Sequence, residues 1–357
     1  MALAGQLPDL LVTNLHRRFT GVSATVAALV PRQQTERDIA VVDTGSLGLS
    51  NTWPLWRVIR RGWSRPPRCT ARVWHARRDV EMLLGLFLKH VLRQNWKLVF
   101  TSAAPKRHGR VLRSIMNHMD AIIAVSERAA AFHDWHSVVV PHGVDTDDFV
   151  PAEDRDELVA ESGLPATCLI GAFGRLRGSK GTDLFVKAMI DLLPDFPHCA
   201  AFLTGLAKDE AYLANLKQGV REAGLTDRIV FLGDLPAADF RLWYQRVSLV
   251  VAASRTEGFG LTPMEAMASG APAVTSGAGY WPELIKPGIN GERFETGNVE
   301  DLKRVLRPLL ADEKALKLLG RKARKDVVAH HSIKREVAGI HAMYDAVLSG
   351  KTNVGKM

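Results

Sequence analysis

Short apolar runs alternate with amphipathic segments along most of the chain. After residue 166, most of these runs are followed by a segment whose apolar residues recur at helical spacing. Strands that alternate with helices build a parallel sheet that is covered on both faces. The predicted strands span 168–173, 198–203, 229–232, 249–253 and 272–275, and the predicted helices span 183–193, 209–223, 237–246 and 263–269. This half of the chain is therefore predicted to be a doubly wound α/β domain.

The first half repeats the same theme more loosely. Its predicted strands span 10–14, 39–43, 72–74, 97–101, 121–126 and 138–140, with a helix at 24–30. Segment 141–151, PHGVDTDDFVP, is rich in turn-forming residues, which places a domain boundary near Pro151. The pattern predicts two Rossmann-like domains, 1–150 and 151–331, facing each other across a cleft, and a final segment, 332–357, with a helix at 332–348. Ligands of such sheets bind beyond the carboxyl ends of the strands.

Composition identifies an ordinary folded protein. Hydrophobic residues make up 46% of the 357 residues and charged residues 24%, which excludes wholesale disorder. No apolar run approaches the ~18 residues of a membrane-spanning helix. The N-terminal residues lack the basic region of a secretory signal, and three widely spaced cysteines suit a reducing compartment. We therefore expect a cytoplasmic protein.

Positive charge is concentrated in the first half. Residues 1–150 hold 20 Lys and Arg against 12 Asp and Glu, whereas the remainder holds 27 against 26. Within residues 51–128 the balance is 16 to 4, and five of the eight tryptophans lie there too. Such a surface attracts polyanions, either nucleic acid or a membrane of acidic lipids. A merely solvated basic face is the plain alternative.

The loop after the predicted strand 168–173 has the composition of a diphosphate clamp. Its sequence, GRLRGSKG at 174–181, supplies glycines for close backbone approach and two cations, Arg175 and Lys180, just before a helix start. The spacing matches neither GxGxxG nor GxxxxGK[ST], which disfavours the nicotinamide and P-loop nucleotide classes. A basic turn with three glycines can also be purely structural.

Two glutamates follow the predicted strand 249–253. Glu257 lies in a glycine-flanked loop, and Glu265 lies near the start of the helix at 263–269, with seven residues between them. Carboxylates can accept hydrogen bonds from the vicinal hydroxyls of a ribose or a hexose, while helix-start amides face an anion. Taken alone, the pair is also compatible with a helix cap and a solvated face.

Three motifs in order carry a family resemblance. Gly174-Arg175…Lys180-Gly181, then FLGDLP at 231–236, then SRTEGFGLTPMEAMASGAPAV at 254–274, resemble the donor half of the retaining group 1 glycosyltransferases of the GT-B fold. PHGVD at 141–145 is similar to the interdomain PNGVD turn of that family, with His142 in place of asparagine. The resemblance implies an enzyme that transfers a sugar from a nucleotide sugar. It also implies that the C-terminal helix, within 332–357, crosses back to the N-terminal domain.

The resemblance also implies roles for individual residues. Arg175 and Lys180 would hold the diphosphate of the donor and stabilise the leaving group, and Glu265 would bind the ribose. Glu257 would lie under the transferred sugar. The remaining expected donor contacts are the amides of Gly258, Phe259, Gly260 and Leu261, the base-lining loop with Gly233 and Leu235, and Gly21 in the first domain. The two DxD-like triplets, 145–147 and 154–156, fall in or beyond the interdomain turn rather than in a donor loop, so we expect no metal or other cofactor.

The acceptor is expected at the first domain. His75, after the predicted strand 72–74, would orient the acceptor hydroxyl or the sugar at the rim of the cleft. A packed or solvated histidine is the plain alternative. The cations expected to meet an anionic acceptor are His16, Arg17, Arg18, Arg77, Arg78, Lys106 and Arg107. Within the family, HARRDVEMLLGLFLKH, KLVFTSAAPKRHGR and MDAIIAVSE are similar to the lipopolysaccharide core mannosyltransferases of Gram-negative bacteria. That similarity implies GDP-mannose as donor, the Kdo inner core as acceptor, and peripheral contact with the acidic cytosolic face of the inner membrane.

Three other interpretations of the sequence compete with this one. The same fold could use a UDP-hexose, or another acceptor that is soluble or a glycolipid. A basic nucleic-acid-binding protein is a different class, but the chain has no RNP, helix-turn-helix or zinc motif, so we expect no nucleic-acid partner. A catalytically dead sugar-nucleotide sensor is disfavoured because Arg175, Lys180, Glu257 and Glu265 are all present.

Overall fold

The computed structural model describes residues 6–18, 20–45, 47–66, 68–103, 108–133 and 137–350, and they form two compact units. The first unit contains the described residues up to His142 together with those from Ile333 onward. The second unit is Gly143–Ser332. The chain thus enters the second unit at Gly143, within the turn-rich segment whose end, Pro151, marked the boundary in the sequence.

A parallel sheet forms the centre of the first unit. Its strand order is β2-β1-β3-β4-β5-β6. The strands are β1 (Leu10–Asn14), β2 (Ile39–Asp43), β3 (Arg72–Ala76), β4 (Trp96–Ser102), β5 (Ala121–Ala124) and β6 (Val138–Val139). Leu10 of β1 is in register with Ile39 of β2 on one side and with Val73 of β3 on the other. The chain therefore moves outward from β1 to β2 and then crosses back over β1 to form β3. The strands are apolar on both faces because both faces are covered.

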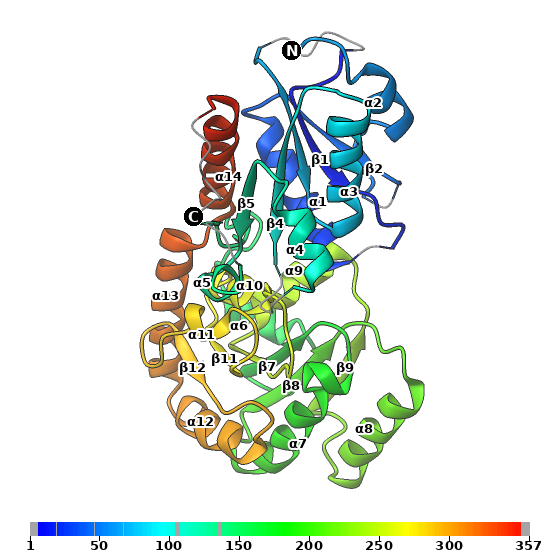
Figure 1. Cartoon of the computed structure of the whole chain (residues 1–357). Helices are drawn as coiled ribbons and strands as arrows, with labels where there is room; N and C mark the ends of the chain where they lie inside the picture. The colour runs from blue at the N-terminus through cyan, green and yellow to red at the C-terminus, as the bar shows by residue number, and fades with distance from the viewer. Residues whose placement is uncertain are drawn as a thin grey trace. The chain divides into compact units, whose positions relative to one another are not determined.

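Two layers of helices cover this sheet. α1 (Gly21–Gln34) and α14 (Ile333–Leu348) pack on the face that carries Val12 and Val41. The opposite face, with Leu11 and Trp74, is covered by α2 (Leu55–Arg61), α3 (Asp79–Leu86), the π-helical turn η1 (Phe87–Val91) and α4 (Arg110–Met116). Figure 1 shows α3 and α4 on the other side of the sheet from α14. A short helix, α5 (Glu127–Ala130), follows β5. The helices α2 to α5 were not predicted from the sequence.

The second unit contains a second parallel sheet, with the order β12-β11-β10-β7-β8-β9. Its strands are β7 (Cys168–Phe173), β8 (Cys199–Thr204), β9 (Ile229–Gly233), β10 (Leu249–Ala252), β11 (Ala273–Thr275) and β12 (Gly291–Arg293). The chain moves outward from β7 to β9 and then returns to β10, which lies beside β7. From β7 the chain continues toward one edge of the sheet, and from β10 it continues toward the other. The loops after these two strands therefore flank a topological switch point, the usual ligand position in such sheets.

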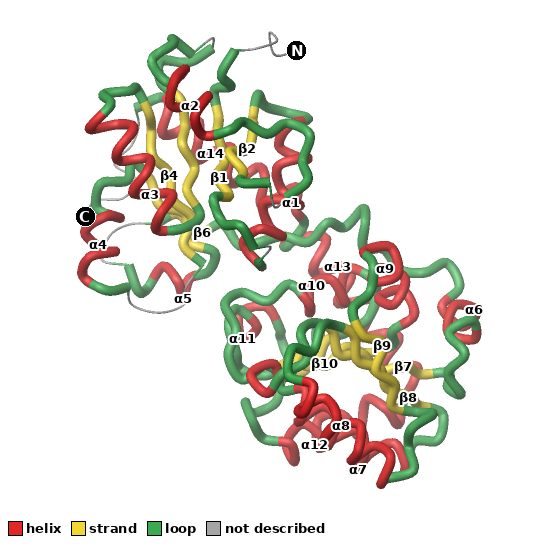
Figure 2. Tube along the Cα trace, turned by 90° about the vertical axis from the view of Figure 1, so that its right-hand side faces the viewer, coloured by secondary structure: helices red, strands yellow, loops and turns green. Residues whose placement is uncertain are grey.

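Helices lie on both faces of this second sheet, as the Cα tube in Figure 2 shows in red around the yellow strands. They are α6 (Arg155–Ala160), η2 (Gly178–Lys180), α7 (Thr182–Leu192), η3 (Leu193–Asp195), α8 (Glu210–Glu222), α9 (Ala237–Arg246), α10 (Thr262–Ala268), α11 (Trp281–Leu284), α12 (Val299–Ala311) and α13 (Glu313–His330). The two doubly wound parallel sheets confirm the predicted fold class. None of the helices in the described part of the chain is both long and apolar enough to cross a bilayer.

Candidate functional site

The loops after β7 and β10 touch at the switch point of the second sheet. Gly181 ends the first loop with a left-handed backbone (φ 69°), and a Cβ placed there would lie 2.0 Å from the carbonyl oxygen of Ala253. Only glycine permits that approach, because any side chain would collide with main chain. The main-chain N–H of Arg255 also donates to the carbonyl of Ser179 at 2.9 Å. The two loops thus form one continuous wall.

An ion pair joins these loops. The Nζ of Lys180, from the first loop, contacts Oε2 of Glu257, from the second, and both side chains are largely shielded from solvent. The other Glu257 oxygen accepts from the N–H of Gly258 at 3.1 Å. A cation and a carboxylate are therefore held side by side where a charged ligand would meet both.

A second, more exposed pair braces the same loops. The guanidinium of Arg255 binds the carboxylate of Asp183 in α7 through two hydrogen bonds of 2.8 and 2.7 Å. Burial alone would raise the pKa of Asp183, but its hydrogen bond to Arg255 and the charge of that residue hold the pKa below its usual value. The sequence did not indicate this pair, since 72 positions separate the two residues and nothing in their spacing connects them.

Lys180 and Glu257 line a cavity within the second unit. Arg175, exposed at its edge, and Gly174 contribute from the loop after β7, while Thr262 and Trp281 close it from α10 and α11. The indole N–H of Trp281 donates to the carbonyl of Gly260 at 3.0 Å, which fixes the second loop against α11. Two cations and one carboxylate in a cavity with a glycine-rich wall suit a ligand that carries both phosphates and hydroxyl groups.

Glu265 lies on α10 and is not among the residues that line this cavity. Its Oε2 accepts a hydrogen bond of 2.7 Å from the hydroxyl of Tyr244, whose ring stacks on Phe173 with centroids 3.8 Å apart. Burial raises the pKa of Glu265 to about 7, although the bond from Tyr244 acts in the opposite direction. Burial, followed by the nearby Glu265 charge, raises the pKa of Tyr244 well above its usual value, so the tyrosine stays a neutral donor. The carboxyl group of Glu265 therefore titrates near neutral pH.

The other predicted donor residues lie in the loop after β10, around the end of β9 and at the start of α1. Phe259 is buried and stacks on Tyr280, with ring centroids 4.4 Å apart, whereas Gly258 is exposed. Leu261 is the residue before α10, and Gly260 has a left-handed backbone (φ 81°). Gly233 ends β9, and Leu235 packs against the core beyond it, so neither lines the cavity described above. Gly21 is the exposed first residue of α1 in the first unit.

The structure corrects the placement of His75. The residue lies within β3 rather than after it, and only 1% of its surface is exposed. Its Nδ1 is 2.6 Å from the hydroxyl of Tyr344, and its Nε2 is 2.7 Å from the hydroxyl of Thr101. Burial, followed by the charge of Arg77, holds the pKa of His75 well below its usual value. The expectation that His75 follows the strand at the rim of the cleft is wrong, and the alternative of a packed histidine is confirmed: the ring is buried and both nitrogens have hydrogen-bond partners.

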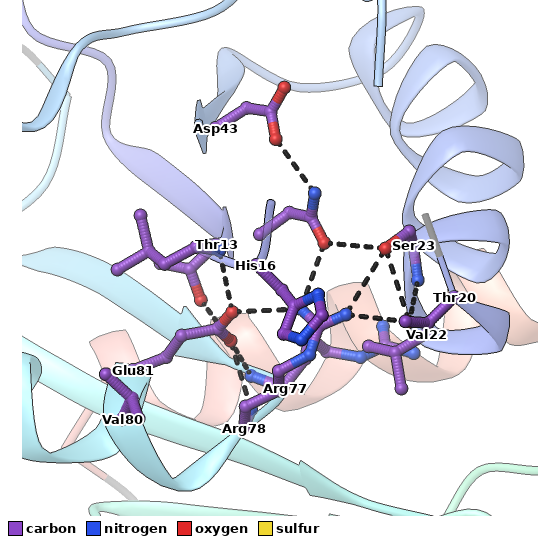
Figure 3. Close-up of polar contacts among 12 residues, drawn as sticks. Thr13, His16, Thr20, Val22, Ser23, Asp43, Arg77, Arg78, Val80 and Glu81 are labelled. Atoms are coloured by element: carbon purple, nitrogen blue, oxygen red, sulfur yellow. Dashed lines mark hydrogen bonds and ion pairs between the residues drawn. The ribbon is translucent and has the colours of Figure 1, made fainter. Parts of the chain in front are cut away.

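A buried carboxylate organises the turn after β3. Glu81, with no exposed surface, accepts hydrogen bonds from the main-chain N–H groups of Leu15, Arg77 and Arg78 at 2.7 to 3.0 Å and from the Thr13 hydroxyl at 2.8 Å. Figure 3 shows this network. We call it the Glu81 clasp. It joins the end of β1 to the start of α3, two segments at the switch point of the first sheet.

Two of the predicted acceptor cations are used inside this region. Arg78 donates to Asn14 at 2.9 Å, to Thr20 at 2.9 Å and to Ser23 at 3.2 Å, and it pairs with Glu81. Arg77 is buried and donates to Thr25 at 3.0 Å. Their guanidinium groups bind neighbouring side chains, because the start of α1 supplies polar partners within reach.

Three of the five remaining acceptor candidates lie in one exposed turn. His16, Arg17 and Arg18 are exposed in the turn after β1, where Nδ1 of His16 accepts from the N–H of Arg18 at 3.1 Å. Lys106 and Arg107 lie outside the described residues.

The acidic triplets near the domain boundary have local structural roles. Asp154 caps α6 by accepting from the N–H of Glu157 at 3.0 Å, and Asp145 accepts from the N–H of Asp147 at 3.1 Å. Among the residues that the structure describes, no group of three or more His, Cys, Asp or Glu side chains is placed to hold a metal ion.

The fold and the two-loop site define a class of enzyme. Residues 154–326 match the family model described as "Glycosyl transferases group 1", and this range includes Lys180, Glu257 and Glu265. The lipopolysaccharide core biosynthesis mannosyltransferase LpcC of Rhizobium leguminosarum bv. viciae is 42% identical over 95% of this chain and 97% of its own. LpsB of Rhizobium meliloti, with the same description, is 38% identical over 95% of this chain and 98% of its own. The chain therefore belongs to the group 1 glycosyltransferases.

Solved structures agree with this assignment. The C-terminal domain of the group 1 family protein LpcC of Francisella tularensis is 34% identical, with a TM-score of 0.52, over 54% of this chain and all of that domain. Anabaena Alr3699/HepE, solved in complex with UDP, has a TM-score of 0.80 over 95% of this chain and all of its own at 19% identity, so it supports the GT-B fold alone.

Proposed function

We propose that the protein transfers mannose from GDP-mannose to the Kdo inner core of lipid-linked lipopolysaccharide, with retention of the anomeric configuration. The observation that carries this proposal is its similarity, over nearly the whole length of both chains, to two lipopolysaccharide core biosynthesis mannosyltransferases. Because that similarity extends through the first unit as well as the second, it supports an assignment of the acceptor as well as of the reaction type.

The cavity between the loops after β7 and β10 is the proposed donor site. Departure of GDP builds negative charge on the β-phosphate, and fixed cations stabilise that charge where water is excluded. Lys180, already held by Glu257, and Arg175 would supply those cations. This arrangement supports a reaction without a metal ion, in which Lys180 exchanges part of its contact with Glu257 for the phosphate oxygens.

Two carboxylates would read the hydroxyl groups of the donor. Glu257 would accept from the transferred sugar, and Glu265 would accept from the ribose, with Tyr244 fixing the orientation of the Glu265 carboxylate. An ionised carboxylate is the stronger acceptor. Since the pKa of Glu265 is raised to about 7, its capacity to bind the ribose would increase across neutral pH.

The acceptor would meet the first unit. Kdo is a sugar acid, and the exposed turn with His16, Arg17 and Arg18 at the carboxyl end of β1 carries the charge that a carboxylate requires. The enzyme would act at the cytosolic face of the inner membrane, in peripheral contact with acidic lipid.

The assay uses the purified chain with radiolabelled GDP-mannose or UDP-glucose and Kdo-containing lipid A. We expect transfer from GDP-mannose in the presence of EDTA, and an increase of the melting temperature with GDP, because a ligand bound only by the native state stabilises it. Transfer from UDP-glucose but not GDP-mannose would contradict the donor assignment. Linkage analysis of the core oligosaccharide from a strain without this protein would test the acceptor: a truncated core that lacks mannose is expected.

A further inference from the structure

Large apolar side chains are exposed along one face of the α3–η1 helix in the first unit. Val80 is 62% exposed, Leu83 50%, Phe87 43% and Val91 64%. Their spacing of three or four residues places them on the same side of the helix, opposite the side that packs on the sheet through Met82 and Leu88. An apolar stripe of this length on an outer surface is typical of an interaction site.

Neighbouring helices extend the stripe. Val111 of α4 is 76% exposed, and Ile115 of α4 lines a shallow groove together with Phe87 and Val91. On the α2 side, the indole N–H of Trp63, 58% exposed, donates to the carbonyl of Leu92 at 2.9 Å, directly after η1. Trp63 and Leu92 thus link the segment after α2 to the end of η1, and we call the outer sides of α2, α3, η1 and α4 together the α2–α4 face.

The charge of this face has one dominant sign. Arg57 and Arg60 of α2, Arg93 after η1 and Arg110 of α4 are exposed. The two acidic residues in these four fully described helices are Glu81, buried in the clasp, and Asp79, which is exposed. Exposed basic side chains therefore outnumber exposed acidic ones on these helices.

This combination matches a bilayer surface better than a folded partner. Tryptophan and arginine place their polar ends at the headgroup level while their apolar parts enter the lipid, and arginine adds attraction to anionic lipids. Valine, leucine and phenylalanine between them contribute by leaving water. A soluble protein partner would need an acidic surface with a matching apolar ridge. A membrane of anionic lipids offers negative headgroups and an apolar interior over its whole surface.

We propose that the α2–α4 face docks the enzyme on a bilayer that contains anionic lipids. This docking rests on the proposed function in one respect, because a lipid-linked acceptor lies at such a surface. The observations that carry it are the exposure and charge of these helices. It identifies the side of the first unit that meets the membrane.

Vesicle sedimentation tests the proposal with the full chain. Wild-type protein is expected to bind vesicles of phosphatidylethanolamine mixed with phosphatidylglycerol, and to bind vesicles of phosphatidylcholine only weakly. L83N/F87N is expected to bind the anionic vesicles about tenfold more weakly. R57Q/R60Q is expected to lose about fivefold for each cation removed, with a smaller loss at high salt. Matched controls from the second unit, I289N/L318N and R321Q/K322Q, change equally exposed positions and should bind like wild type.

The failure of this inference can be told apart from the failure of the proposed function. L83N/F87N should retain wild-type transfer to a deacylated, water-soluble core acceptor and lose transfer to the acceptor in vesicles. If wild type does not bind anionic vesicles, or if L83N/F87N binds them as tightly as wild type, the docking face is wrong even when transfer to the soluble acceptor persists. A wild-type dimer that L83N/F87N converts to a monomer would assign the face to a second copy and overturn the proposal. If wild-type protein binds anionic vesicles but transfers mannose to neither acceptor, the proposed function is wrong and the docking face is retained.

Discussion

Lys180 and Glu257 form an ion pair that joins the loops after β7 and β10, although 77 positions separate them in the sequence. Each residue gives the other a fixed orientation before any ligand arrives. The carboxylate beside the cation also neutralises part of the positive charge that lines the cavity. In the proposed function, Lys180 would exchange part of this contact for the diphosphate of the donor.

Removing the cation of this pair should weaken nucleotide binding. Lys180→Met is expected to reduce the affinity for GDP by roughly 10- to 100-fold, because a charge-assisted hydrogen bond to phosphate contributes about 1.5–3 kcal/mol. Isothermal titration calorimetry measures the effect. Lys187→Met, an exposed lysine on α7, is the matched control and should bind GDP normally. Equal affinities for the two variants would remove Lys180 from the diphosphate site.

Neutralising the carboxylate of the pair should affect turnover rather than nucleotide binding. Glu257→Gln is expected to lower kcat by about 100-fold, the typical effect of losing one preorganised polar group at a reacting centre, while GDP binds as tightly as before or more tightly because Lys180 is released. Steady-state kinetics and calorimetry together separate the two effects. Glu153→Gln, at an exposed position of the second unit, serves as control. Unchanged kcat would exclude Glu257 from the reaction.

Glu265 should make both stability and nucleotide binding depend on pH. Its pKa rises from 4.5 to about 7 on folding, so the unfolded state releases its proton first and the free energy of unfolding falls by about 3 kcal/mol as pH rises from about 4.5 to about 7. Ionisation in the folded state should at the same time strengthen ribose binding up to about pH 8.

The Glu265→Gln variant isolates both effects. It should be more stable than wild type at about pH 8 and lose the pH dependence of GDP affinity around neutrality. Urea denaturation and calorimetry at several pH values are the measurements. A wild-type affinity that does not change between about pH 6 and pH 8 would contradict the role assigned to the Glu265 carboxylate.

The Glu81 clasp should contribute strongly to the stability of the first unit. Glu81→Gln replaces one acceptor oxygen by an amide that would face N–H donors, so the free energy of unfolding should fall by about 2–4 kcal/mol. Asp79→Asn, exposed in the same turn of α3, should change it by less than about 0.5 kcal/mol. Chemical denaturation followed by circular dichroism measures both, and similar values for the two variants would show that the clasp carries no special energy.

His75 should remain neutral in the folded protein. Its lowered pKa means that protonation favours the unfolded state, so the contribution of His75 to stability is complete above about pH 6.5 and is lost as pH falls below that value. NMR of the ring Hε1 proton, assigned by its disappearance in His75→Gln, should show no titration near pH 6.5. A midpoint close to 6.5 would place the ring in contact with solvent.

The second half of the chain could be predicted closely because its elements follow strong local rules. The strand at 168–173 and the helix at 237–246 have the bounds of β7 and α9, and buried parallel strands with turn-forming boundaries explain that agreement. The first half was harder. α2, α3, η1 and α4 present valine, leucine, phenylalanine and tryptophan to solvent, so the amphipathic contrast that identifies a helix is weak there.

The sequence by itself determined the two doubly wound sheets, the glycine-rich loops with Lys180 and Glu257, and the helix with Glu265, because periodicity, turn chemistry and motif spacing are local properties of the chain. The tertiary structure decided which of these groups pair with one another. It placed His75 in the core, used Arg77 and Arg78 inside the first unit, and joined Lys180 to Glu257. Burial and long-range pairing depend on which strands become neighbours, and that order is fixed only when the whole sheet packs.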